Sequence, residues 1–94
     1  MQLQQTKADI SFEIKKAWTK MDDALKNMKI TRKNYNLSGQ IYENQKQQYR
    51  LGGFNYDHLL NTEKSLNTAE QNYIQSVYDY LIAKLNYEKA LGGY

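Results

Sequence analysis

Cysteine and proline are absent from this chain of 94 residues, and glycine occurs only five times. Without cysteine there is no disulfide framework and no thiolate chemistry. With a single histidine, a structural zinc site within one chain is not expected. The lack of proline favours long helices, because proline breaks a helix interior. No stretch approaches the roughly 18 consecutive apolar residues of a membrane-spanning helix.

The composition is polar, and the charge is unevenly divided. Hydrophobic residues make up 40% of the chain, and the mean hydropathy is -0.88. Residues 1–50 carry 10 basic and 5 acidic side chains (+5), whereas residues 51–94 carry 3 and 5 (−2). No nucleic-acid partner is expected, because the lysines are spread around the first segment and no aromatic stacking motif accompanies them. The division instead predicts a basic helix beside a mildly acidic one.

Apolar and small residues recur at alternating steps of four and three, which is the pattern of a coiled coil. In the first half the seam comprises Ile10, Ile14, Ala17, Met21, Ala24, Met28, Thr31, Tyr35, Ser38, Tyr42, Gln45 and Tyr49. In the second half it comprises Leu59, Thr62, Leu66, Ala69, Tyr73, Ser76, Tyr80, Ala83, Tyr87 and Ala90. The pattern predicts an all-α fold over residues 1–94: a long antiparallel two-helix coiled-coil hairpin. Its helices are expected at about residues 3–50 and 56–91, with large seam residues of one opposite small ones of the other.

Residues 51–55 form the expected turn between the helices. Gly52 and Gly53 permit the positive backbone angles that reverse a chain, and Asn55 can cap the second helix by accepting a backbone N–H. The second helix is expected to stop at Gly92-Gly93. Gly39 lies inside the first helix, where it costs about 1 kcal/mol relative to alanine. The residues leave open whether Gly39 is simply tolerated or marks a close approach of the helices.

A second apolar stripe lies off the seam on each helix. It consists of Trp18, Leu25, Ile30, Leu37 and Ile41 on the first helix and Leu60, Ile74, Val77, Leu81 and Leu85 on the second. One partner helix cannot cover both a seam and a second stripe, and large exposed apolar strips usually mark an interface. We therefore expect the hairpin to self-associate as a homo-oligomer.

No group of residues points to catalysis. His58 has neither a nucleophile nor an orienting partner in the sequence pattern. The adjacent carboxylates Asp22 and Asp23 point to different sides of a helix. The glycine turn lacks the Lys-Ser/Thr pair that a phosphate-binding loop requires. We expect no enzymatic activity, no metal and no cofactor.

Several motifs occur in a fixed order around the central turn. They are Tyr49-Arg50-Leu51-Gly52, the polar cap Asn55, Leu59-Leu60, Leu66, Ala69-Glu70-Gln71-Asn72-Tyr73, Tyr78-Asp79-Tyr80 and Ala90-Leu91-Gly92. This set resembles the second helical repeat of TolC-like outer-membrane efflux proteins, clearly over residues 42–92 and more softly over 3–41. The resemblance implies a segment excised from a longer, trimeric channel. Met1 followed by Gln-Leu-Gln-Gln is typical of a start codon added to an excised segment. The hairpin would belong to the periplasmic α-helical barrel of that channel.

The resemblance also assigns roles around the turn. The tip would dock the hairpin of a periplasmic adaptor (membrane fusion) protein, which connects the channel to an inner-membrane pump in a tripartite assembly. The docking residues would be Arg50, Leu51, Gly52, Gly53, Phe54 and Asn55. The pore or gate candidates are Tyr49, His58 and Asn61, of which Tyr49 matches a tyrosine that helps to hold the tip closed.

The sequence departs from the family at the gate. The arginine that partners the tyrosine is replaced by Phe54, and the acidic residues that narrow the pore are replaced by His58 and Asn61. Gating would therefore rest on other contacts than a tyrosine–arginine latch or a ring of carboxylates. The residues alone leave open whether Gly52-Gly53 docks a partner or only turns the chain.

Two other classes of protein remain as alternatives. A small secreted helical hairpin of the Trp-x-Gly type has a similar length, but it carries its tryptophan in the central turn and a Tyr-x-x-x-Asp/Glu signal near its end. Here the single tryptophan, Trp18, is far from the turn, and no tyrosine after the turn has an acid four residues later. A generic coiled-coil interaction module would show no preference for an adaptor hairpin.

Overall fold

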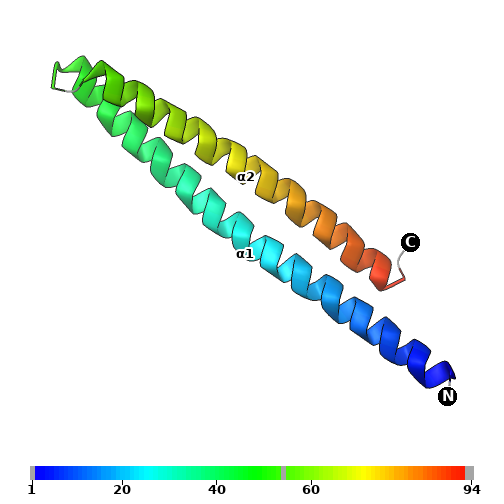
Figure 1. The fold of residues 1–94 in the computed structure, drawn as a ribbon. Coiled ribbons are helices and arrows are strands. Elements are labelled where there is room, and N and C mark those ends of the chain that lie inside the picture. Colours follow the sequence, from blue (N-terminus) through cyan, green and yellow to red (C-terminus); the bar gives the residue numbers. More distant parts are fainter. Residues whose placement is uncertain (1, 54, 93–94) are drawn as a thin grey trace. The chain divides into compact units, whose positions relative to one another are not determined.

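The computed structural model describes residues 2–53 and 55–92, with side chains from residue 7 onward. Over these ranges the chain forms two helices and no strand: α1 (Gln2–Arg50) and α2 (Tyr56–Ala90). The helices are joined by a short turn and pack against each other as an antiparallel hairpin (Figure 1). The predicted all-α hairpin is confirmed, and its expected helix limits, 3–50 and 56–91, differ from the observed ones by one residue at the far ends.

The hairpin divides into two compact units. The terminal unit (Met1–Met28 and Ser76–Tyr94) pairs the first part of α1 with the last part of α2. The tip unit (Lys29–Gln75) contains the rest of both helices and the turn between them. Each unit therefore has its own stretch of the interface between α1 and α2.

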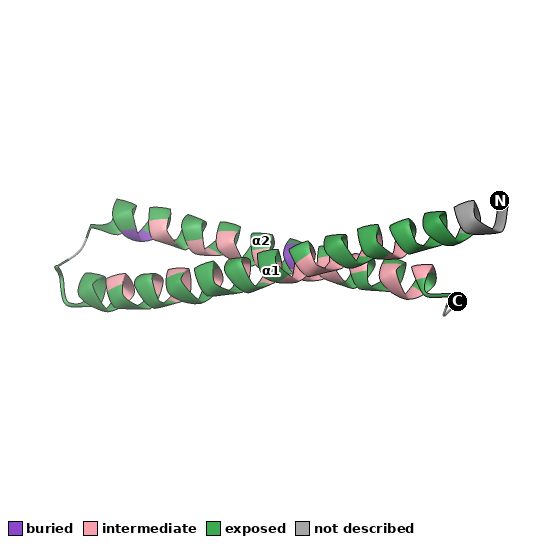
Figure 2. Cartoon of the chain, turned by 90° about the horizontal axis from the view of Figure 1, so that it is seen from below, coloured by how far each residue is buried: buried purple, intermediate pink, exposed green. Residues whose placement is uncertain are grey.

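The helix interface buries a single line of side chains. Of the described residues, only Leu59 and Ser76 are buried, with exposed fractions of 8% and 2%. The other seam residues from Ile14 to Gln45 and from Thr62 to Ala90 are half-buried, and Figure 2 shows half-buried residues along both helices amid exposed ones. Two helices can cover only one face of each other, so the thin interior follows from the two-helix architecture.

Two predicted seam residues are exposed, and both lie near an end of α1. Ile10 is 51% exposed and Tyr49 is 40% exposed. α1 has 49 residues and α2 has 35, so the start of α1 runs beyond the end of α2 (Figure 1). No helix is left to cover Ile10. Tyr49 stands in the last turn of α1, where the chain is leaving the interface for the tip.

The register of the tip unit differs from the expected one. We predicted large seam residues opposite small ones, but Tyr35 stacks on Tyr73, with ring centroids 5.9 Å apart. Further along the interface, the hydroxyl of Thr62 donates a hydrogen bond to Oε1 of Gln45. In one layer a large residue therefore faces a large one, and in the layer closer to the tip a polar residue faces a polar one.

Gly39 lies in the tip unit opposite Leu66. A methyl group added at Gly39 would lie 3.9 Å from Cδ1 of Leu66, which is an ordinary van der Waals distance. The backbone there has ordinary helical geometry, since the described glycines with a positive φ are Gly52 and Gly92. Of the two alternatives, the structure favours a tolerated glycine, because the interface has room for a side chain.

Candidate docking tip

The end of α1 is closed by hydrogen bonds from the glycine turn. The backbone N–H of Gly52 donates to the carbonyl of Tyr49 (2.9 Å), and that of Gly53 donates to the carbonyl of Gln48 (2.9 Å). Gly52 has a φ of 81°. This is the Schellman arrangement, in which a residue in the left-handed region satisfies carbonyls that the helix leaves unpaired. The turn is therefore a defined structure and not an open loop.

The two glycines of the turn have different requirements. Gly52 needs its positive φ, which disfavours any side chain with a Cβ. Gly53 is not among the described residues with positive φ, and a Cβ there would meet the carbonyl oxygen of Gln48 at an ordinary 3.7 Å. Position 53 can therefore accept a side chain, whereas position 52 resists one. That difference provides a way to alter the surface of the tip without breaking the turn.

The start of α2 is capped by Asn55, as predicted. The N–H of Asp57 donates to Oδ1 of Asn55 at 2.8 Å, and the N–H of Leu59 donates to the carbonyl of Asn55 at 3.1 Å. Asp57 is the acidic residue of the first turn, where a negative charge is favourable beside the positive end of the helix dipole. The two hydrogen bonds to Asn55 therefore fix the start of α2 and the direction in which it leaves the turn.

A contact between two tyrosines bridges the base of the tip. The rings of Tyr49 and Tyr56 lie 5.7 Å apart between centroids, with their planes at 45°. Tyr49 was a gate candidate, but the sequence reasoning missed Tyr56. The sequence does contain a signal for this contact, because one aromatic residue stands on each side of the short loop. Tyr49 lies in the last helical turn of α1, and Tyr56 is the first residue of α2. The contact ties the two helices together where the seam ends.

The predicted docking residues are accessible to solvent. Arg50, Leu51, Gly52, Gly53 and Asn55 are all exposed, and Leu51 has an exposed fraction of 87%. Phe54 lies outside the described residues. The Leu51 side chain therefore provides an exposed apolar contact surface next to the backbone of Gly52 and Gly53. The guanidinium-bearing Arg50 supplies a polar neighbour.

The remaining two gate candidates lie on α2. His58 and Asn61 are both exposed, and their spacing of three residues places them on the same side of the helix. They are separate from Tyr49, whose ring contacts Tyr56 in the first turn of α2. The candidates therefore belong to two places: one at the base of the turn and one along the outer surface of α2.

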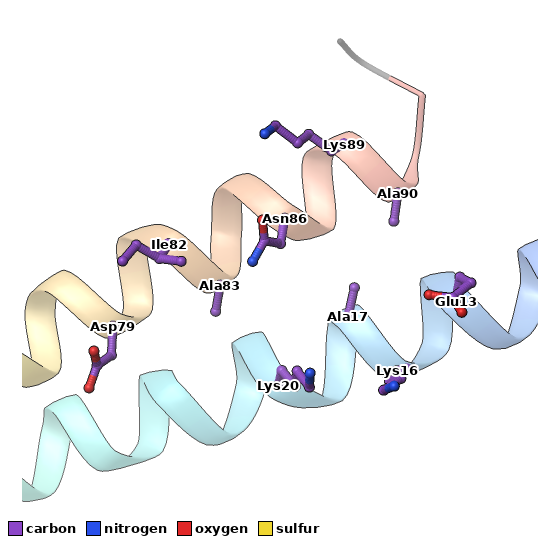
Figure 3. Close-up of a pocket in the computed structure, with 10 residues that line it drawn as sticks. All are labelled: Glu13, Lys16, Ala17, Lys20, Asp79, Ile82, Ala83, Asn86, Lys89 and Ala90. Atoms are coloured by element: carbon purple, nitrogen blue, oxygen red, sulfur yellow. The ribbon is translucent and has the colours of Figure 1, made fainter.

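A shallow groove of about 600 Å³ runs between the helices of the terminal unit. Ala17 on α1 and Ala83 and Ala90 on α2 point toward the opposite helix, and their small side chains leave the space open (Figure 3). The rim has mixed charge, from Glu13, Lys16, Lys20, Asp79 and Lys89. It shows no pairing of a base with a nucleophile.

Among the residues that the structure describes, no group of three or more His, Cys, Asp or Glu side chains is arranged to hold a metal ion. In the same ranges, neither helix is long and apolar enough to cross a membrane. An ion pair joins Lys26 Nζ to Asp22 Oδ2 at 3.0 Å, and this hydrogen bond and the carboxylate charge raise the pKa of Lys26 above its usual 10.5. Lys26 is exposed and Asp22 is half-buried, and a pair so accessible to water contributes little to stability.

Comparison with known proteins adds no assignment: no family model matches the chain, and no curated protein or solved structure matches it. The fold itself defines the class of molecule, an antiparallel helical hairpin with a capped and exposed tip. The function must be argued from the tip, the uncovered surfaces and the order of the motifs along the chain.

Proposed function

We propose that the chain is a periplasmic hairpin from the α-helical barrel of a TolC-like outer-membrane export channel, and that its tip docks a periplasmic adaptor protein. The observation that carries the proposal is the form of the tip. A capped turn presents exposed Leu51 and two glycines that both have room for a Cβ atom, of which only Gly52 is restricted by a positive φ. The exposed leucine beside the glycine backbone supports a docking role for this turn.

The chemistry of the tip suits a helical partner. Gly52 and Gly53 are exposed and have no side chains, so a partner side chain can approach their backbone groups. Leu51 supplies apolar contact, and Arg50 supplies a polar rim, the usual division of an interface into core and edge. The Tyr49–Tyr56 contact and the Asn55 cap fix the end of α1 and the start of α2 beside the turn, which lowers the entropy cost of binding.

The uncovered apolar residues suit the wall of a barrel. Of the predicted second stripe, Trp18, Ile30, Leu37, Ile41, Leu60, Ile74, Leu81 and Leu85 are exposed in the isolated chain. A barrel wall places further hairpins against such surfaces, which supports a homo-oligomer and a trimeric parent. The likeness of the ordered motifs to the second repeat of TolC-like proteins gives the location: the periplasmic portion of an outer-membrane protein.

Binding to the adaptor tests the proposal. The probe is the purified periplasmic adaptor encoded beside the parent gene, titrated with the hairpin. The variant Gly53→Asp adds a charge to the turn, and Gly53→Ala is the matched control. We expect Gly53→Asp to weaken binding at least about tenfold, Gly53→Ala to bind nearly as well as the natural chain, and all three to have the same helicity by circular dichroism.

Three results would contradict the proposal. Failure of the natural hairpin to bind the adaptor would remove the docking role. Binding that is indifferent to Gly53→Asp would take the tip out of the contact and would favour a generic coiled-coil module that uses its exposed stripes. A parent gene without flanking membrane-barrel segments and a second hairpin would contradict the assignment to an export channel.

A further inference from the structure

Three tyrosines are exposed among the residues that the structure describes, and two of the three are in contact. Tyr49, Tyr56 and Tyr78 have exposed fractions of 40%, 54% and 64%, whereas the other described tyrosines are half-buried. The rings of Tyr49 and Tyr56 lie 5.7 Å apart between centroids, with their planes at 45°. The base of the tip therefore presents two phenol groups that are close to each other and open to solvent.

The second close pair of tyrosines, Tyr35 with Tyr73, has a similar spacing and a different geometry. Its ring centroids are 5.9 Å apart, its planes are inclined by only 26°, and both rings are half-buried in the helix interface. Stacked rings present their faces to each other, and packing against neighbouring side chains restricts their rotation. The exposed rings at the tip are free to turn, because the torsion that rotates a tyrosine ring has broad minima.

This difference matters for one reaction of tyrosine. A phenol that loses one electron and its proton becomes a neutral radical, with spin density on the two ring carbons next to the one that bears oxygen. Two such radicals combine through these carbons, so the rings must meet at their edges and not at their faces. An exposed, tilted pair can reach that arrangement, and a stacked pair inside an interface is held away from it.

We propose that Tyr49 and Tyr56 are a site of oxidative cross-linking, at which hydrogen peroxide and a haem peroxidase join the two rings by a carbon–carbon bond. Each phenol gives one electron and one proton to the oxidant. After the radicals combine, the hydrogen on each bonded carbon moves to oxygen and restores the phenol. The chain loses two hydrogen atoms in total, and one molecule of peroxide is reduced to two molecules of water.

The bond would close the tip covalently. It would connect the last turn of α1 to the first residue of α2, so the two helices could no longer separate at this end. The chain has no cysteine, so a disulfide cannot serve the same purpose. The inference depends on the geometry of the two rings and not on the function proposed for the tip.

Contact within one chain favours this bond over a bond between chains. Groups joined by a short segment have an effective concentration in the millimolar range, so at about 10 μM protein the intramolecular product is favoured by about 100-fold. The yield per chain should then be the same when the protein is diluted.

The test treats the purified chain with hydrogen peroxide and a haem peroxidase, at two protein concentrations about tenfold apart. Trypsin cleaves after lysine and arginine, so it releases residues 47–50, which contain Tyr49, and residues 51–64, which contain Tyr56. We expect mass spectrometry to find these peptides joined, with two hydrogen atoms fewer than their sum. The intact product should have the mass of one chain, and its yield should not change on dilution.

Three conservative variants and one internal comparison complete the experiment. Tyr49→Phe and Tyr56→Phe should each abolish the joined peptide, and Tyr78→Phe should leave it unchanged. The peptides of residues 34–46 and 65–84, which contain the stacked pair, should be joined at least about tenfold less, because their rings are wrongly oriented.

Four outcomes would overturn the inference. They are the absence of a joined peptide 47–50 with 51–64, its persistence in either tip variant, a yield that falls on dilution, and an equal or greater yield from the stacked pair. The first would show that the tip rings do not couple, and the second that another residue forms the bond. The third would place the bond between chains, and the fourth would show that ring orientation does not select the site.

Discussion

The ring of Tyr35 on α1 stacks on the ring of Tyr73 on α2, with centroids 5.9 Å apart and planes inclined by 26°. This contact shows the register of the tip unit, since a large seam residue of one helix lies directly against a large seam residue of the other. Both tyrosines are half-buried. Aromatic pairs contribute beyond the area that they cover.

A double-mutant cycle measures that contribution. We expect Tyr35→Ala and Tyr73→Ala to be coupled by about 0.5–1.5 kcal/mol, the usual range for aromatic pairs, in urea unfolding at a fixed protein concentration. The matched control combines Tyr35→Ala with Tyr56→Ala, at the other end of the tip unit, and should be additive within about 0.5 kcal/mol. Additivity of the Tyr35 and Tyr73 changes would mean that their contact is not energetically significant.

Gly39→Ala is expected to stabilise the hairpin. The added methyl group would meet Leu66 at an ordinary distance of 3.9 Å, and alanine is favoured over glycine in a helix by about 1 kcal/mol. The midpoint of thermal unfolding should therefore rise. Gly39→Val gives a comparison, because its branched side chain needs more room beside Leu66 and has a lower helix propensity. A loss of stability with alanine would indicate that the helices need a closer approach at this point.

The two turn glycines should respond differently to alanine. Gly52 has a φ of 81°, so Gly52→Ala is expected to cost about 1–2 kcal/mol, the penalty of an L-residue in the left-handed region. Gly53→Ala, which has space and no positive φ, should be close to neutral. Equilibrium unfolding of both variants makes the comparison. Equal effects at the two positions would contradict the turn geometry described for the end of α1.

Removal of the helix cap should destabilise the start of α2. Asn55→Ala deletes the side-chain acceptor of the Asp57 N–H, and loss of such a cap costs about 1 kcal/mol. Amide hydrogen exchange should increase most in the first turn of α2. Asn67→Ala, at an exposed position inside α2, is the control and should be neutral or slightly stabilising. Unchanged exchange near Asp57 after Asn55→Ala would show that other groups satisfy the helix end.

The exposed stripe of α1 should govern self-association. Leu37 and Ile41 have exposed fractions of 55% and 42%, so Leu37→Gln with Ile41→Gln should leave the hairpin folded. We expect the association constant to fall at least about tenfold, because each buried aliphatic side chain contributes about 1.5–3 kcal/mol to an interface. Sedimentation equilibrium measures the change, with Asn36→Gln and Asn44→Gln as the polar control. Association that is equal in both variants would place the interface elsewhere.

The sequence determined the elements and their ends, because these depend on local chemistry. The four–three spacing of the seam predicted both helices, with limits one residue from those observed at the far ends. Asn55 and the glycine turn were identifiable because a side-chain acceptor and a left-handed backbone act within a few residues. The exposed second stripe followed from counting apolar residues, since two helices can cover only one side of each other.

The tertiary structure decided how the helices meet. A coiled-coil seam is nearly unchanged when one helix slides by half a heptad, so the sequence did not determine whether Tyr35 would face a large or a small residue. For the same reason, the contact between Tyr49 and Tyr56 was not predicted from the sequence. Ile10 also fits the seam pattern, although α2 ends too early to cover it. Register depends on the sum of contacts along the whole interface, which no short stretch of sequence contains.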